Sequence, residues 1–279
     1  MSSASTDGLY LPSRLSRLKS FLALPTQCRL CQSWQSELVC QPCLTRWRQP
    51  GMRCARCAIL LPHHANDSVC QACQEAPPEF DRTIAALDYA APWAGLLARL
   101  KFMDDTALAP MLARLLNDAV SKHPHPVDLI VPIPLSAKRL QERGYNQAWL
   151  IARHLARLQG TAAHPDVLRR THETQRLMNL DAEARRQQIR GAFVMNPEAL
   201  RQIQGRDIAL VDDVLTTGAT LSEAAAVLRE AGARSITAWV VARTPAPEQL
   251  LQGATDSIWP ETEPWARPSH RTGTHSRFE

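Results

Sequence analysis

The cysteines constrain the fold of this chain more than any other feature of its sequence. All eight lie between residues 28 and 73 of a 279-residue chain, in four Cys-x-x-Cys pairs. The pairs are Cys28/Cys31, Cys40/Cys43, Cys54/Cys57 and Cys70/Cys73. This spacing places two thiolates on one tight turn, so that two pairs together complete a closed tetrahedral metal site. The sequence therefore predicts two structural zinc ions in this region.

Two other interpretations of the cysteines are weaker. Disulfides need an oxidising compartment, and no secretory signal precedes the first pair. A thioredoxin-like redox site would show one such motif beside a βαβ unit. The pairs could group sequentially, first with second and third with fourth, or in an interleaved, cross-braced way. The spacers within each such site, eight residues between the first and second pairs and twelve between the third and fourth, favour the sequential grouping.

Length and composition exclude several classes of protein. With 45% hydrophobic residues the chain can bury a core, which excludes wholesale disorder. No apolar run approaches the roughly 18 residues of a membrane-spanning helix, which excludes an ordinary membrane protein. The formal charge of +5 overstates the basic character. Eight metal-bound thiolates and two zinc ions would reduce it to about +1.

Positive charge is nevertheless concentrated around the first cysteines. Residues 11–60 carry eight basic side chains against one acid, Glu37, and Trp34 and Trp47 lie among them. Aromatic side chains among cations can stack on single-stranded bases, which would make this region a contact for single-stranded DNA. Alternatively, these cations screen the thiolates and cover a small module.

Both ends of the chain differ from its middle. Within residues 1–27, Leu11, Leu15, Leu18 and Leu22 recur at helical spacing, which predicts a short amphipathic helix. Residues 246–279 contain scattered prolines and no periodic apolar pattern, which predicts a disordered tail. Between these segments we expect a double zinc module with four cysteines per site over residues 28–75, and a second domain over residues 80–245.

The second domain has the pattern of an α/β fold. Short, nearly all-apolar runs predict strands buried on both faces of a parallel sheet, and longer amphipathic runs predict flanking helices. The predicted strands are 83–89, 128–133, 207–211 and 235–242, and the predicted helices are 94–102, 108–120, 145–158 and 221–231. The last strand–helix–strand unit is a βαβ crossover, which requires parallel strands.

The clearest chemical signal lies at the first turn of that crossover. Asp212 and Asp213 follow an apolar strand, where adjacent carboxylates can accept hydrogen bonds from two neighbouring hydroxyls. Thr216, Thr217, Gly218 and Thr220 come next, just before a helix. Exposed amides and hydroxyls at a helix N-terminus can hold a phosphate dianion. A diol acceptor beside a phosphate site fits a ribose 5-phosphate. The alternative is an acidic turn that caps a helix.

At these residues the sequence resembles the ComF/GntX family, the competence protein F-like members of the type I phosphoribosyltransferases. The resemblance covers roughly residues 28–245 and includes the cysteine pairs, Val131–Ser136, Arg143–Gln147 and the stretch from Gln175 to Phe193. It implies a type I phosphoribosyltransferase-like parallel sheet flanked by helices, preceded by a double zinc-ribbon-like module. The resemblance also implies a cytoplasmic protein, and some members are linked to DNA uptake during natural transformation, alongside a helicase-like partner.

The resemblance also implies roles for individual residues. Asp212 and Asp213 would hold the ribose hydroxyls as the catalytic pair. The 5-phosphate site and the pyrophosphate loop would comprise Thr216, Thr217, Gly218, Ala219, Thr220, Ser136, Lys138, Arg139 and Arg143. Mg²⁺ would accompany phosphoribosyl pyrophosphate. Lys138, Arg139 and Arg143 could instead be the solvated start of a helix.

Residues 169–190 form a basic, polar stretch that interrupts the α/β pattern. In the enzyme class a loop here closes over the substrate and excludes water. Gln175, Arg185 and Arg186 match family positions, whereas Gln188 stands where an asparagine is expected. A polar loop without a catalytic role is the alternative interpretation.

Two functions follow from these features. One is a phosphoribosyltransferase that acts on an unidentified acceptor, since the sequence shows no signature of a nucleobase pocket. The other is a non-catalytic protein that binds phosphoribosyl pyrophosphate as a sensor or scaffold, while its zinc module engages single-stranded DNA or a protein partner.

Overall fold

The computed structural model describes residues 25–48, 51–62, 67–171 and 189–246. The amphipathic helix expected within residues 1–27, most of the polar loop and nearly all of the expected tail lie outside the described residues. In the described part, no helix is long and apolar enough to cross a membrane.

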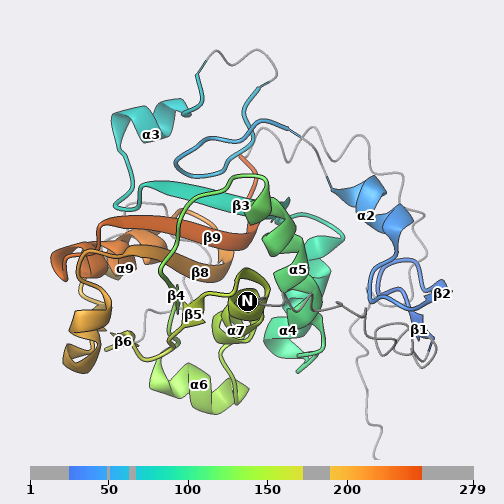
Figure 1. The fold of residues 1–279 in the computed structure, drawn as a ribbon. Helices are drawn as coiled ribbons and strands as arrows, with labels where there is room; N and C mark the ends of the chain where they lie inside the picture. The colour runs from blue at the N-terminus through green and yellow to red at the C-terminus, as the bar shows by residue number, and fades with distance from the viewer. Residues whose placement is uncertain (1–24, 49–50, 63–66, 172–188, 247–279) are drawn as a thin grey trace, which may run out of the picture. The chain divides into compact units, whose positions relative to one another are not determined.

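A five-stranded parallel sheet forms the centre of the α/β region (Figure 1). Its order is β3-β9-β8-β4-β5, so β8 lies in the middle and β3 at one edge. The strands are β3 (Arg82–Asp88), β4 (Leu129–Pro132), β5 (Ala162–Ala163), β8 (Asp207–Leu215) and β9 (Ser235–Arg243). The four predicted strands and the parallel βαβ crossover are confirmed. Because neighbouring strands are parallel, their carboxyl ends meet at one edge of the sheet.

Helices cover both faces of the sheet, and each face has its own core. On one face α4 (Trp93–Phe102), α5 (Leu108–Ser121) and α7 (Gln147–Gln159) pack on alternate strand residues such as Ile130 and Val211. On the other face α9 (Ala219–Glu230) packs on the intervening residues, such as Val131 and Leu210. This alternation is the reason that the predicted strands read as continuous apolar runs.

The ends of the helices have local causes. Asn146 caps α7 by accepting hydrogen bonds from the amides of Ala148 and Trp149, at 2.9 and 3.3 Å. Gly160 ends the same helix with a φ of +66°, a left-handed conformation that glycine adopts without strain. Ser136 caps α6 (Ala137–Arg143) by accepting from the amide of Arg139. These caps agree with Ser and Asn as preferred N-cap residues.

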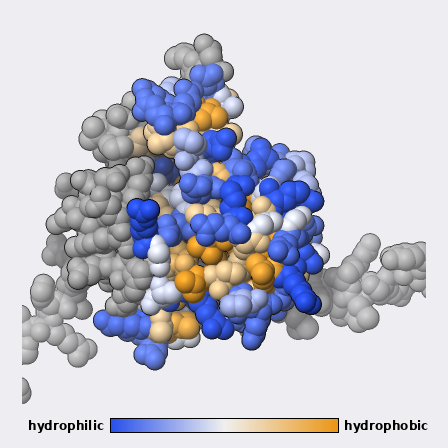
Figure 2. Space-filling view, turned by 90° about the vertical axis from the view of Figure 1, so that its left-hand side faces the viewer, coloured by the Kyte–Doolittle hydropathy of each residue, from blue (hydrophilic) through white to orange (hydrophobic). Residues whose placement is uncertain are grey.

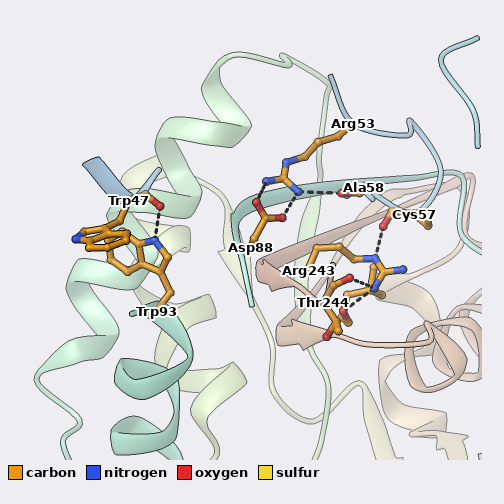
Figure 3. Close-up of polar contacts among 9 residues, drawn as sticks. Trp47, Arg53, Cys57, Ala58, Asp88, Trp93, Arg243 and Thr244 are labelled. Carbon is orange, nitrogen blue, oxygen red and sulfur yellow. Dashed lines mark hydrogen bonds and ion pairs between the residues drawn. The ribbon is translucent and has the colours of Figure 1, made fainter. Parts of the chain in front are cut away.

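The first four cysteines lie in a small unit on the α4–α5 side of the molecule. It comprises the short strands β1 (Thr26–Gln27) and β2 (Trp34–Gln35) and the helix α2 (Gln41–Trp47). Val39, Cys40 and Cys43 belong to the same core as α4 and α5. The indole Nε1 of the buried Trp93 donates to the backbone oxygen of Trp47 at 2.8 Å (Figure 3).

The second four cysteines lie beside the edge strand β3, and α3 (Gln71–Glu75) contains the last of them. The amide of Thr83 donates to the oxygen of Ala55 at 3.1 Å, which covers part of the edge of β3. Arg53 forms two hydrogen bonds with the Asp88 carboxylate, at 2.8 and 3.1 Å (Figure 3). Both cysteine-rich segments therefore pack against the α/β region.

A short antiparallel pair, β6 (Leu168–Arg170) with β7 (Phe193–Met195), brackets the polar stretch singled out in the sequence. The 3-10 helix η1 (Pro197–Gln202) follows β7 and packs on the α9 side of the sheet. The face turned toward the viewer in Figure 2 shows limited groups of hydrophobic residues among hydrophilic ones. Such a surface is typical of a chain whose large apolar residues are gathered inside.

Candidate functional site

The eight cysteines form two clusters of four. Cys28, Cys31, Cys40 and Cys43 make one, and Cys54, Cys57, Cys70 and Cys73 the other, with all sulfurs of a cluster within 4.8 Å of one another. The Sγ–Sγ distances include 3.6 Å for Cys31–Cys40 and 3.7 Å for Cys57–Cys70. A tetrahedron with metal–sulfur bonds of about 2.3 Å has edges of about 3.8 Å. The sequential grouping is confirmed, the cross-braced grouping is wrong, and the donor set fits zinc.

Backbone amides point at sulfur atoms in both clusters. Cys40 N donates to Cys28 Sγ at 3.4 Å, and Cys70 N donates to Cys54 Sγ at 3.3 Å. Burial raises the pKa of Cys54, but hydrogen bonds from the amides of Cys57 and Cys70 outweigh it and lower that pKa to about 7. Burial raises the pKa of Cys57 to about 11. A buried thiol of this kind becomes a thiolate when a cation binds, which is what a metal site requires.

The acidic pair lies inside the central strand rather than beyond its end. β8 continues to Leu215, and its pairing with β9 runs through Asp212 without a shift of register. The expectation of a strand that ends at residue 211 is therefore wrong, because ladder hydrogen bonds carry the strand past two polar residues. Asp212 is half-buried, and Asp213 is only 3% exposed. The amide of Asp213 donates to Asp212 Oδ1 at 2.8 Å.

Lys101 is the counter-charge of this pair, and the sequence did not identify it. It comes from the end of α4, and its Nζ lies 2.8 Å from Asp213 Oδ2. Burial raises the pKa of Asp213, but the Lys101 ammonium outweighs burial and holds that pKa below its usual range. Burial and the charge of Asp213 raise the pKa of Asp212 well above its usual range. Of the two carboxyl groups, Asp213 is therefore the more readily ionised.

Arg143, one of the predicted anion-binding residues, also belongs to this cluster. Its charge contributes to the lowered pKa of Asp213. The guanidinium lies over the ring of Phe102 at 5.4 Å and donates to Gln147. Phe102 is the residue after Lys101, so α4 and α6 present neighbouring side chains beside the carboxylates. The fold thus brings residues from three elements to one place.

The phosphate loop predicted at residues 216–220 links β8 to α9. Thr216 and Thr217 are exposed, and Gly218 occupies the N-cap of α9 with a φ of +86°. A Cβ built on Gly218 would be 3.8 Å from Leu215 and 3.9 Å from Phe80, so conformation rather than space favours glycine. No acceptor among the described residues binds the amides of Thr216, Thr217 or Gly218. This loop therefore presents donors at the N-terminus of a twelve-residue helix.

The predicted pyrophosphate loop leaves the same edge of the sheet. It follows β4, which pairs in parallel with β8, so the two loops emerge side by side. Lys138 is exposed and Arg139 is half-buried, whereas Ser136 is buried and caps α6. Gln175, Arg185, Arg186 and Gln188 lie outside the described residues.

Comparisons with known proteins agree with this arrangement. A family model described as "Phosphoribosyl transferase domain" matches residues 168–259. The DNA utilization protein YhgH of Salmonella typhi is 32% identical over 235 residues, which cover 80% of this chain and 99% of that protein. Competence protein F of Haemophilus influenzae is 34% identical over 195 residues, 68% of this chain and 84% of that protein.

Two further likenesses cover smaller parts of the proteins concerned. Competence protein ComFC of Bacillus subtilis is 32% identical over 53% of this chain and 58% of that protein. The glutamine phosphoribosylpyrophosphate amidotransferase structure from B. subtilis covers 48% of this chain and 26% of its own, with a TM-score of 0.34 and 18% identity. The order and direction of the strands define the fold.

A helix-flanked parallel sheet, a phosphoribosyltransferase domain and two four-cysteine clusters are thus combined in one chain, which is similar to YhgH over nearly the whole of that relative. The chain belongs to the ComF/YhgH family of competence and DNA utilization proteins.

Proposed function

We propose that this chain binds phosphoribosyl pyrophosphate at the carboxyl edge of its sheet and transfers the phosphoribosyl group to an acceptor. The observation that carries the proposal is the pair Asp212–Asp213 near the end of β8, followed by a loop in which the amides of Thr216, Thr217 and Gly218 have no acceptor among the described residues. Carboxylates suit the two ribose hydroxyls, and free amides at a helix N-terminus suit the 5-phosphate.

The side chains of the site have distinct proposed roles. Asp213, held ionised by Lys101, accepts a hydrogen bond from one ribose hydroxyl, and Asp212 accepts from the other. Thr216, Thr217, Gly218, Ala219 and Thr220 surround the 5-phosphate with amides and hydroxyls. The proposal assigns the pyrophosphate group to the loop Ser136–Arg139 and to Arg143.

The proposed reaction is a displacement at the anomeric carbon of the ribose, in which pyrophosphate departs and the acceptor bonds to that carbon. Mg²⁺, which accompanies the substrate, neutralises charge on the departing group. The Lys138, Arg139 and Arg143 cations add to this neutralisation, which matters most as negative charge develops in the transition state. No acceptor is assigned to the site.

The two four-cysteine clusters are proposed to hold one structural zinc ion each. Thiolates at tetrahedral spacing favour zinc, and four protein ligands leave no open coordination position for catalysis. The cytoplasmic location and the helicase-like partner that the family resemblance implies stay predictions.

Metal analysis tests the two sites separately. The purified protein should contain two zinc ions per chain, and Cys31→Ser should reduce this to one, because a three-thiolate site binds zinc less tightly. Ser36→Ala, a nearby change at an exposed position that keeps all eight thiols, should retain two. Mass spectrometry under native conditions and elemental analysis give the count, and a wild-type chain with fewer than two metal ions would contradict the assignment.

Calorimetry with phosphoribosyl pyrophosphate and Mg²⁺ tests the substrate site. Asp212→Asn and Asp213→Asn should each weaken binding by about 10- to 100-fold, since each removes a hydrogen bond to a charged group. Asp128→Asn is the matched control, because Asp128 precedes β4 at the opposite edge of the same sheet. The absence of binding by the wild-type chain would refute the proposal.

Turnover is measured with the same variants. Release of pyrophosphate on addition of candidate acceptors would support the transferase, and tight binding without release across acceptors would favour a sensor or scaffold.

The pH dependence of binding tests the role of Lys101. Affinity should rise with pH as Asp212 ionises, because its pKa is raised and the ionised form accepts the ribose hydroxyl. Lys101→Met removes a cation that lowers the pKa of both carboxyls, so its binding curve should move to higher pH, while Lys101→Arg should keep the wild-type curve. Protonation of phosphoribosyl pyrophosphate itself also changes with pH, but it affects wild type, Lys101→Met and Lys101→Arg equally and so does not alter the difference between their curves. Coincident curves for wild type and Lys101→Met would exclude this role.

Contact with single-stranded DNA is the second candidate function, and a basic groove favours it. The groove has a volume of about 770 Å³ and lies between α2, residues 51–55, β3 and the end of α5. Its lining includes Arg48, Arg53, Arg82, Lys122 and His123, against one acid, Asp118. Among the described residues, Arg53 pairs with Asp88, whereas Arg48, Arg82 and Lys122 make no ion pair.

The two tryptophans singled out in the sequence differ in their availability for stacking. The Trp34 residue is 69% exposed, whereas Trp47 is half-buried beside Trp93 with Arg46 over its ring at 4.9 Å. The groove supports the proposal mainly through its charge, which matches the phosphates of an extended strand.

Band-shift titrations with an oligothymidylate test this second function. The double variant Arg82→Glu/Lys122→Glu should weaken binding at least about tenfold and flatten the dependence of log K on log salt by about 1.4, the slope expected for two lost phosphate contacts. Arg206→Glu, a charge reversal at an exposed position before β8, is the control and should bind like the wild type. Equal affinities for the double variant and the wild type would rule out the groove.

A further inference from the structure

Arg243 lies where the second four-cysteine cluster meets the phosphate loop. It is the last residue of β9, and within the described part of the chain its guanidinium donates hydrogen bonds only to backbone oxygens (Figure 3). The acceptors are the oxygens of Cys57 at 2.9 Å, Leu215 at 3.2 Å, Thr216 at 2.6 Å and Thr244 at 2.7 Å. No carboxylate among the described residues pairs with this arginine. Its charge therefore serves to orient peptide groups.

Two of these peptide groups belong to the start of the phosphate loop. In a planar trans peptide the oxygen and the N–H of the following residue point in opposite directions. When the oxygens of Leu215 and Thr216 face Arg243, the amides of Thr216 and Thr217 face away from it. These are amides that have no acceptor among the described residues. The Leu215 oxygen also accepts from the Thr244 amide at 2.9 Å, whereas Arg243 is the donor to the Thr216 oxygen, so Arg243 contributes most directly to the direction of the Thr217 amide.

Another of the four acceptors, the backbone oxygen of Cys57, belongs to a residue that is also a candidate metal ligand. Cys57 contributes its sulfur to the second cluster, while its backbone oxygen accepts from Arg243 Nε. A metal bound to Cys54 and Cys57 would fix the turn that joins these two residues. The fixed turn would keep the backbone oxygen of Cys57 within hydrogen-bond distance of the Arg243 guanidinium. The adjacent Arg56 oxygen accepts from the Thr83 hydroxyl at 2.6 Å, so the same turn is also fastened to β3.

Packing joins the same two regions. Ala58, the residue after Cys57, is 1% exposed and belongs to one core cluster with Phe80 and Leu215. Phe80 in turn lies beside Gly218 of the phosphate loop. A displacement of the turn at Cys57 would therefore disturb both the hydrogen bonds of Arg243 and the apolar support of the loop.

We propose that Arg243 is a positioning residue that couples metal occupancy of the second four-cysteine cluster to binding at the phosphate loop. The coupling rests on the proposed function, since its ligand is phosphoribosyl pyrophosphate. By linkage it acts in both directions: the metal favours the binding-competent loop, and the bound ligand retains the metal. The first cluster is an internal control, because it packs on the face of the sheet that α4 and α5 cover, whereas Ala58, Phe80 and Leu215 belong to the core on the α9 face.

Cysteine alkylation in the full-length, zinc-loaded protein tests the coupling without any mutation. A chelator and an alkylating reagent are added with and without phosphoribosyl pyrophosphate and Mg²⁺, and mass spectrometry follows each cysteine-containing peptide. The ligand should slow modification of Cys54, Cys57, Cys70 and Cys73 by roughly tenfold, a typical size for coupling between two sites. Modification of Cys28, Cys31, Cys40 and Cys43 should keep its rate. Equal protection of both clusters, or of neither, would overturn the coupling.

A pair of arginine variants tests the residue itself. Arg243→Gln should weaken ligand binding by roughly tenfold in calorimetry and abolish the selective protection of the second cluster. Arg234→Gln is the matched control, because Arg234 precedes the other end of β9 and bonds to Asp207. It should keep both properties of the wild type. Wild-type affinity and protection in a folded Arg243→Gln would overturn the assignment.

Circular dichroism and zinc content establish that the variants are folded. Should Arg243→Gln be unfolded, Arg243→Lys, which keeps the charge but donates fewer hydrogen bonds, takes its place with the same expected losses. A wild-type chain that does not bind the ligand would overturn the proposed function and with it this coupling. Wild-type binding without selective protection overturns the coupling alone.

Discussion

The parallel pairing of β8 with β4 on one side and β9 on the other decides where the candidate site residues lie. It carries the end of β4, the acidic pair and Arg243 to one edge of the sheet, although these segments are far apart in the chain. The helices that cover the two faces leave this edge to loops. Ligands bind at such an edge in open α/β sheets because several loops converge there.

The acidic pair is unusual because it lies within the ladder of the central strand and is partly withdrawn from water. Burial of adjacent carboxylates is unfavourable unless a cation or a proton compensates. Lys101 supplies one positive charge to Asp213, and the raised pKa of Asp212 leaves the second charge to be balanced by a proton or a ligand.

Sequence patterns predicted most of the α/β region, because strands buried on both faces read as apolar runs and helices as amphipathic ones. The missed features are of two kinds. The two-residue strand β5 and the short β6–β7 pair are too brief for periodicity to reveal. The strand β8 extends beyond its apolar run, because Asp212 and Asp213 interrupt that run while the backbone ladder continues. Lys101 had no local signal, since nothing in the sequence distinguishes it from Arg99, the other charged residue of α4.

The sequence by itself determined the chemistry that short spacings create: the thiolate pairs, the acidic pair and the glycine-containing loop before α9. Each of these depends on residues that one turn or one strand end brings together. Only the tertiary structure decided which side chains from distant segments complete these groups. Lys101 reaches Asp213 because α4 packs across the sheet, and Arg243 reaches Cys57 because the second four-cysteine segment lies against β3 and β9. Such contacts follow from the order of the strands and the packing of helices, which local patterns leave open.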